Sequence, residues 1–235
     1  MVTHDEAIRQ ALRPPQRRAT LILLSSTVLM LTWRYFASPD FLAGRLAGHG
    51  SDGRVAGAIG SFVACFVLLG VIPAAVVKLL LRERLADYGL RGSMTWKTWA
   101  AAAQLVPLFI LVAYGASRTP AILEKFPINP RATDSATLFA LHAATYLLFY
   151  VGWEFHFRGF LLCGLRPTIG AANAILVQTM ASALLHIGSP AGETFGAIAA
   201  GLLWGLLAIR TGSLLPGLVQ HFLLGIALDV FIAWR

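Results

Sequence analysis

Long apolar runs separated by short polar segments fill the chain after residue 18. A helix needs about 20 apolar residues to cross the hydrocarbon core of a bilayer, and only helices and closed barrels satisfy their backbone hydrogen bonds in lipid. The runs are too long for barrel strands, so each predicts a membrane-spanning helix. The seven predicted spans are residues 19–37, 56–81, 97–116, 136–162, 171–188, 192–210 and 213–234.

This pattern predicts an all-α fold, a polytopic transmembrane bundle in a cell membrane. Residues 1–18 form a basic tail, which the positive-inside tendency places in the cytoplasm. Residues 19–135 are expected to form N-terminal transmembrane helices, and residues 136–235 a second bundle. Gly201 and Gly205 have the small-xxx-small spacing, which we interpret as close packing of two helices within the bundle, with a dimer face as the alternative.

The composition agrees with this architecture, because 57% of the 235 residues are hydrophobic and only 13% are charged, against roughly 25% charged residues in a soluble domain. The net charge of +8 could indicate nucleic-acid binding. The basic residues stand in short segments between apolar runs, where they set orientation and meet anionic lipid. We therefore expect a lipid bilayer and no nucleic acid as partner. Cys65 and Cys163 lie in separate apolar runs and predict neither a disulfide framework nor a zinc cluster.

Ionisable residues within the predicted spans concentrate in the last four. A charged group near the bilayer centre is costly and persists only where another group compensates it. The residues concerned are Glu154, His156, Arg158, His186, Glu193, His221 and Asp229. Their concentration predicts a polar site inside the bundle. We interpret His156, which points to a different face from Glu154, and His142 as packing residues.

Chain geometry allows several of these side chains to meet. Glu154 and His186 lie at similar distances before and after a predicted turn near residue 169, so they reach similar depths in antiparallel helices. His221 lies near the same level in the last span. Glu154 and Arg158 are four residues apart and can pair directly, either as a structural ion pair or within an active site.

Three short motifs follow one another in this region: Glu154-Phe-His-Phe-Arg158-Gly159, Ser182-Ala-Leu-Leu-His186 and His221-Phe-Leu-Leu-Gly225. In order and spacing they resemble the motifs EExxxR, FxxxH and HxxxN or HxxxD of the CAAX-protease and bacteriocin-processing (CPBP or ABI) family of intramembrane proteases. The resemblance covers about residues 136–234 and implies that residues 136–235 are the catalytic bundle.

Some positions depart from the family pattern. Trp153 replaces the first Glu of the EE pair, which the family uses to activate water, and Gly225 replaces the Asn or Asp that aids oxyanion binding. Ser182 replaces the Phe of the second motif. One branch of the family has a single Glu after Trp, a later Pro-x-x-Glu and a late Asp, which Glu193 and Asp229 match. The resemblance gives these two carboxylates supporting roles: they would orient the histidines or replace the carboxylate missing at position 153.

The resemblance implies a glutamic-type intramembrane endopeptidase that acts on membrane-embedded or lipidated protein substrates. Glu154 would be the general base toward a peptide carbonyl, and Arg158 would fix it. His186 would hold or deprotonate the water, and His221 would donate to the developing oxyanion. No cofactor is expected. Zinc is the alternative, since two His and a Glu are plausible ligands, although the sequence contains no HExxH motif.

A second class of function is a non-proteolytic membrane protein: an immunity factor, a scaffold for a sorting or secretion complex, or a proton-linked carrier. Buried carboxylates and histidines also suit proton relays. Against a carrier, the sequence has no repeated halves, which many transporters possess.

Overall fold

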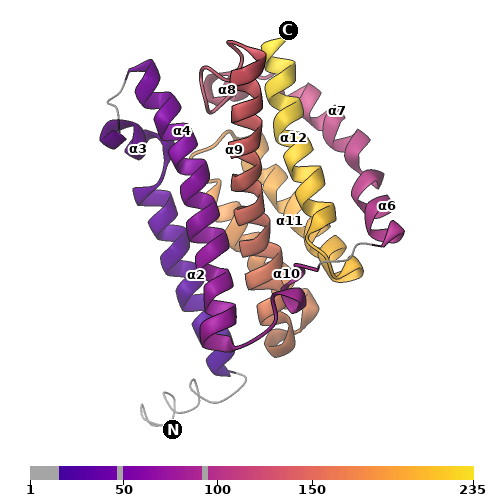
Figure 1. The fold of residues 1–235 in the computed structure, drawn as a ribbon. Helices are drawn as coiled ribbons and strands as arrows, with labels where there is room; N and C mark the ends of the chain where they lie inside the picture. The colour runs from indigo at the N-terminus through magenta and orange to yellow at the C-terminus, as the bar shows by residue number, and fades with distance from the viewer. Residues whose placement is uncertain (1–15, 47–49, 92–94) are drawn as a thin grey trace.

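The computed structural model of the protein describes residues 16–46, 50–91 and 95–235. Every regular element within these ranges is a helix (Figure 1). Six of the helices are long and apolar enough to cross a membrane, so the predicted all-α transmembrane bundle is confirmed. Residues 1–15 of the predicted basic tail lie outside the described residues.

The first two spans form an antiparallel pair. α2 (Gln16–Phe36) is followed by the short helix α3 (Pro39–Leu46). The chain then returns through α4 (Ser51–Cys65), η1 (Phe66–Val71), α5 (Ile72–Ala75) and η2 (Val76–Leu81), which join into one helix of 31 residues. The π-helical segments η1 and η2 stand on either side of Pro73, which has no N–H for an α-helical hydrogen bond.

The third span is bent. A single turn, η3 (Leu85–Tyr88), precedes α6 (Trp96–Gln104) and α7 (Val106–Ala116). The bend lies at Leu105, whose φ of −104° and ψ of 1° depart from helical values, two residues before Pro107. The short helix α8 (Pro120–Lys125) follows at the upper end of the bundle (Figure 1).

The next helix is too long for one crossing. α9 (Ala136–Glu154), the π-helical segment η4 (Phe155–Cys163) and α10 (Gly164–Leu185) run on for 50 residues. A straight helix of that length would measure about 75 Å, more than twice the ~30 Å hydrocarbon core. The run breaks at Gly170, whose φ of 79° and ψ of 164° are essentially open only to glycine. The chain turns back there and α10 packs against η4, so the predicted spans 136–162 and 171–188 are two arms of one hairpin.

The last two helices, α11 (Ala191–Thr211) and α12 (Leu215–Ala233), complete the bundle. A methyl group on Gly201 would lie 2.9 Å from the side chain of Thr179, and one on Gly205 would lie 3.0 Å from that of Gln178. The two glycines therefore allow α10 and α11 to approach closely, as the small-xxx-small pattern predicted. α2 begins at the lower end of the bundle and α12 ends at the upper end (Figure 1).

Helices from both halves of the chain share the interior. α9 packs against α4 and η1, and α12 packs against α6 and α7. Gly152 allows α9 to approach α4 closely, because a methyl group there would lie 2.7 Å from the carbonyl oxygen of Cys65. The division of the chain at residue 135 stays a prediction.

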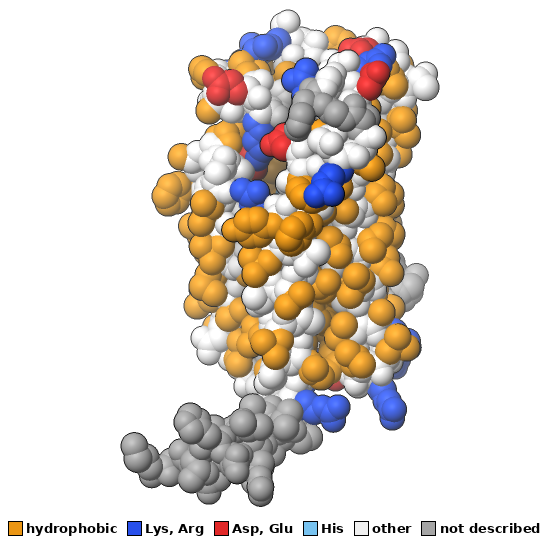
Figure 2. All heavy atoms as spheres, turned by 90° about the vertical axis from the view of Figure 1, so that its left-hand side faces the viewer, with side chains coloured by type: hydrophobic (Ala, Val, Ile, Leu, Met, Phe, Trp, Pro, Cys, Tyr) orange, Lys and Arg blue, Asp and Glu red, His pale blue; other side chains and the backbone are white. Residues whose placement is uncertain are grey.

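Apolar side chains form a belt around the middle of the bundle, and charged side chains gather above and below it (Figure 2). Its members include large apolar residues that are highly exposed, such as Leu24, Val28, Leu111 and Leu176. An apolar surface of this extent is stable only against lipid. The chain is therefore a multi-pass membrane protein. By contrast, every side chain from Phe155 to Leu162 on η4 is buried, which places the charged residues of this segment inside the protein.

Candidate active site

Glu154 is the last residue of α9, and only 1% of its surface is exposed. The imidazole Nδ1 of His221, on α12, lies 2.8 Å from its carboxylate Oε1. The guanidinium Nη1 of Arg158, one helical turn later on η4, lies 3.2 Å from the same oxygen. The structure thus brings together three of the four predicted catalytic residues, from helices that are far apart in sequence.

Arg158 is as deeply buried as Glu154, with 1% of its surface exposed. Its Cζ lies 5.2 Å from the ring centroid of Trp204, on α11, in a cation–π contact. A buried charge is tolerated when a partner of opposite sign compensates it. Arg158 and Glu154 meet this condition for each other, so the buried carboxylate can remain in place.

The second carboxylate oxygen of Glu154, Oε2, is buried and has no hydrogen-bond partner among the described residues. Gly217, in the first turn of α12, lies beside it: a methyl group on Gly217 would be 3.0 Å from Oε2. Buried polar atoms almost always have a hydrogen-bond partner. The missing side chain of Gly217 therefore lets α12 pack directly beside a strong acceptor that no described residue satisfies.

Aromatic rings enclose His221. The ring of Trp204 lies 4.3 Å from the imidazole, and the ring of Tyr150 lies 4.5 Å away in an edge contact. Trp204 Nε1 donates to Gln220 Oε1 at 3.0 Å, and the Gln220 amide donates to the carbonyl oxygens of Ala101 and Ala102. These neighbours of His221 were not predicted from the sequence. Only Gln220 could have been found, because it is a polar residue next to His221 in an apolar run.

His186 stands at the end of α10 in a second polar group. Its Nδ1–H donates to the carbonyl oxygen of Ser182 at 2.8 Å, and its Nε2 lies 3.9 Å from Glu193 Oε1. Lys125, at the end of α8, donates to both carboxylate oxygens of Glu193 at 2.7 and 2.8 Å and to Ser189 Oγ at 2.7 Å. The predicted supporting residue Glu193 is therefore next to His186. Lys125 was missed, because it lies in a polar connection where a lysine is unremarkable.

Trp153 occupies the position where the resemblance expects a second carboxylate. It is 3% exposed, and its ring meets that of His186 edge-on at 5.4 Å. It also stacks on Phe149 with ring centroids 5.4 Å apart. An aromatic wall therefore faces His186 where the family has an acidic group.

The side chain of Tyr150 lies against Gly225. A methyl group on Gly225 would collide with the hydroxyl of Tyr150. Tyr150 is 3% exposed and lies on α9, one turn before Glu154. The tyrosine hydroxyl thus fills the space that an Asn or Asp side chain at position 225 would take.

Asp229 lies away from the predicted histidines. Its Oδ2 is 2.8 Å from Nε2 of His142, and both side chains are 0% exposed. His142, interpreted from the sequence as a packing residue, is thus the partner of the buried Asp229. His156 is also fully buried and hydrogen-bonds to Ser26 on α2. These two pairs connect helices and do not contact Glu154.

The described residues offer no group of three His, Cys, Asp or Glu side chains placed to hold a metal ion. Zinc would need Oε1 of Glu154 and a nitrogen of each histidine about 2.0–2.2 Å from the ion. In this arrangement Nδ1 of His221 is bound to Glu154 itself, and Nδ1 of His186 is bound to the carbonyl oxygen of Ser182. Glu154, His186 and His221 do not form a group that could hold a metal ion, so the described arrangement does not fit zinc.

Residues 135–227 match the family described as Rce1-like, type II CAAX prenyl endopeptidase Rce1-like. No curated protein and no solved structure matches the chain. The matched residues begin directly before α9 and include Glu154, His186 and His221. This membrane protein therefore has an Rce1-like domain at residues 135–227.

Proposed function

We propose that this protein is an intramembrane endopeptidase in which Glu154 is the general base. Its substrates would be membrane-embedded or lipidated proteins. The observation that supports this most strongly is the unequal use of the two oxygens of Glu154. His221 hydrogen-bonds to Oε1 and Arg158 forms an ion pair with it, whereas Oε2 is buried beside Gly217 and has no hydrogen-bond partner among the described residues. A general base needs such a fixed carboxylate with one oxygen left for the water it deprotonates.

The reaction follows from this arrangement. Oε2 of Glu154 accepts a proton from a water molecule while the water oxygen bonds to the carbonyl carbon of the peptide. The carbonyl oxygen becomes an oxyanion. When the tetrahedral intermediate collapses, the C–N bond breaks and the proton on Glu154 passes to the leaving nitrogen. General base and acid catalysis of this kind contributes roughly 10²- to 10⁴-fold to the rate.

The neighbours of Glu154 have distinct parts in the proposal. Arg158 fixes the carboxylate and compensates its charge. His221 is held through Nδ1, which leaves Nε2 to face water or substrate; when the imidazole is protonated, Nε2–H donates to the oxyanion. His186, oriented by Ser182, would hold the water from the α10 side. Glu193 would be a positioning residue for His186, at 3.9 Å.

Tyr150 would replace the oxyanion-binding side chain that is absent at Gly225. The family resemblance gives the side chain at 225 a part in oxyanion binding, and here the Tyr150 hydroxyl fills that space. A phenol is a good hydrogen-bond donor, so Tyr150 would take over the donation. Removing one oxyanion donor typically costs about 10²- to 10³-fold in kcat. Tyr150→Phe should show a loss of this order with the fold intact.

The decisive experiment measures cleavage of a library of fluorogenic membrane-spanning and lipidated peptides by the protein reconstituted in liposomes. Glu154→Gln keeps the shape of the side chain and removes the base, so its rate should fall at least about 100-fold. Gly196→Ala is a matched control, because nothing lies within 4 Å of the added methyl group. Equal cleavage by wild type and Glu154→Gln would refute the proposal and favour a non-proteolytic function.

A chelator arm separates the two mechanisms. The proposed mechanism predicts that activity survives prolonged treatment with EDTA and 1,10-phenanthroline. Activity that is lost on chelation and restored by added zinc would replace the metal-free mechanism with the zinc alternative.

A further inference from the structure

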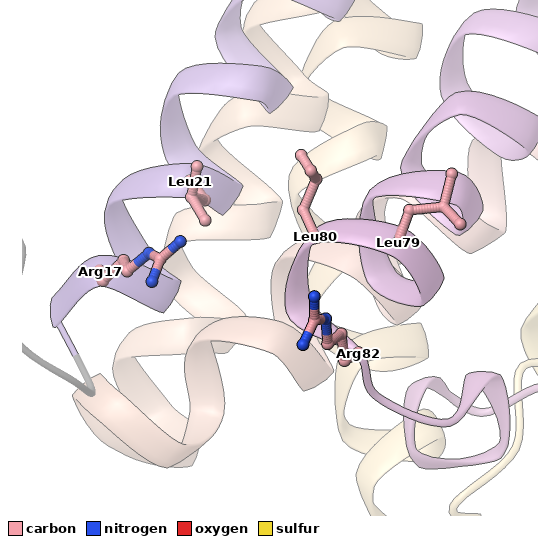
Figure 3. A pocket seen from close by; sticks show the side chains of 5 residues that line it. All are labelled: Arg17, Leu21, Leu79, Leu80 and Arg82. Carbon is pink, nitrogen blue, oxygen red and sulfur yellow. The ribbon is translucent and has the colours of Figure 1, made fainter.

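A cavity of about 440 Å³ opens between the start of α2 and the end of η2 (Figure 3). Both of these helix ends lie at the lower end of the bundle (Figure 1). It is lined by Arg17, Leu21, Leu79, Leu80 and Arg82. In Figure 3 the Arg17 side chain extends from α2 toward η2, and the Arg82 side chain lies across the gap at the end of η2. None of these residues belongs to the candidate active site.

The lining changes from charged to apolar with depth. Arg17 is in the first turn of α2 and Arg82 directly follows η2, so both guanidinium groups lie where the two spans leave the bilayer. Leu21 is one turn further along α2, and Leu79 and Leu80 precede Arg82. Leu79 is 72% and Leu80 is 59% exposed. The cavity therefore has a cationic rim at the level of lipid headgroups and an apolar wall at the level of acyl chains.

The two rim arginines keep their charge for an external partner. Neither has an acidic partner within the described part of the chain. The neighbouring Arg18 is engaged: its Nη2 lies 3.0 Å from Glu83 Oε2 and donates to the Tyr88 hydroxyl at 3.2 Å. Burial raises the pKa of Tyr88, so the phenol stays protonated and donates to Glu83. Arg18 and Tyr88 thus both bind the carboxylate of Glu83, the acidic group next to Arg82 in sequence.

We infer that this cavity binds one anionic phospholipid of the surrounding leaflet. Its phosphate lies between Arg17 and Arg82, and an acyl chain follows Leu21 and Leu80. Guanidinium groups pair with phosphate oxygens through charge-assisted, often bidentate hydrogen bonds, and basic pockets between transmembrane helices bind anionic headgroups. A free phosphate ion would meet the arginines but not the leucines. A zwitterionic lipid would bring its own cation to the rim.

The backbone conformation of Arg82 allows its charge to be removed without strain. Arg82 ends η2 in the left-handed conformation, with φ 58° and ψ 36°. Glycine is the usual residue at such a helix end, because an L-residue is strained there. Arg82→Gly therefore removes the guanidinium group and relieves the backbone. Arg17→Gln removes the other charge at an exposed position of α2.

The experiment measures lipid binding by native mass spectrometry of the full chain released from detergent, together with its thermal unfolding. The probes are phosphatidylglycerol, phosphatidylcholine and inorganic phosphate. Arg54→Gln is the matched control, because Arg54 is an exposed arginine in the first turn of α4, at the opposite end of the bundle (Figure 1). It removes the same charge without touching the cavity.

Phosphatidylglycerol should bind and stabilise the wild type and the Arg54→Gln variant more than phosphatidylcholine does. Arg82→Gly should bind phosphatidylglycerol about fivefold more weakly, and the variant with both changes about 30-fold more weakly, at about 1 kcal/mol for each arginine. Unchanged binding by both variants overturns the inference, as does an equal loss in Arg54→Gln. Millimolar phosphate that stabilises the protein as well as the lipid does would assign the site to a soluble anion instead.

Discussion

The Gly217→Ala substitution would place a methyl group beside the free oxygen of Glu154. The added carbon would lie 3.0 Å from Oε2 and 3.5 Å from Cβ of Trp204. The contact with Trp204 is an ordinary one, but the contact with Oε2 is too short by a few tenths of an ångström. Glu154 cannot easily give way, because His221 and Arg158 hold its other oxygen. The methyl group therefore occupies the space that a water molecule on Oε2 would need.

The expected effects on stability and activity differ widely. Overpacking a close-packed interior costs about 1–3 kcal/mol, and alanine is favoured over glycine in a helix by about 1 kcal/mol. The free energy of unfolding should thus fall by about 0–2 kcal/mol. Loss of the water on the general base should lower kcat at least about 100-fold. A large catalytic loss at nearly unchanged stability is the signature of the proposed water position.

The assay compares kcat for peptide cleavage in liposomes with the unfolding transition of the same preparation in detergent. Gly196→Ala adds the same methyl group to a helix where nothing lies within 4 Å, so it corrects for the general effect of the exchange. Wild-type turnover in Gly217→Ala would refute the assignment of Oε2 as the proton acceptor.

Three further substitutions test the surroundings. Arg158→Met should leave Glu154 buried without its cation and lower the free energy of unfolding by about 3–5 kcal/mol; denaturant titration should show most of this loss recovered in Arg158→Met combined with Glu154→Leu, and no loss in the single variant would contradict the ion pair. Asp229→Ala should destabilise the protein by a similar amount through His142, while the folded fraction keeps its cleavage rate. Lys125→Met breaks a partly exposed ion pair with Glu193 that contributes about 0–1 kcal/mol. A lowered cleavage rate at unchanged melting temperature would support a positioning role for Lys125 and Glu193, and an unchanged rate would exclude that role.

The spans could be predicted because the thickness of a bilayer sets a minimum length for an apolar helix. The predicted span 192–210 corresponds to α11 (Ala191–Thr211), and 19–37 to α2 (Gln16–Phe36). What the pattern did not contain was the continuity of α9, η4 and α10. Hydropathy falls in the polar segment around residue 167, but the backbone stays helical as far as Gly170, because loss of apolar character does not by itself end a helix.

The centre of the site was also within reach of the sequence. The spacing of Glu154 and Arg158 follows from the helical repeat, and the depth of His221 follows from counting along its span. The side chains that surround these residues could not be predicted, because they depend on the rotation of each helix about its axis. That rotation turns Tyr150 and Trp204 toward His221 and Asp229 toward His142, and single-residue spacing contains no information about it.

The break at Gly170 has a consequence for the lipid around the protein. The arm of α10 beyond it rises only about 22 Å, less than the ~30 Å thickness of the hydrocarbon core. The non-helical turn after His186, with Ser189 and the Lys125–Glu193 pair, therefore sits where an undisturbed bilayer would be dry. Backbone of this kind persists at membrane depth only beside water or protein, and a short hydrophobic segment thins the bilayer next to it. We therefore expect the leaflet above α10 to be thinned, so that water reaches the level of His186.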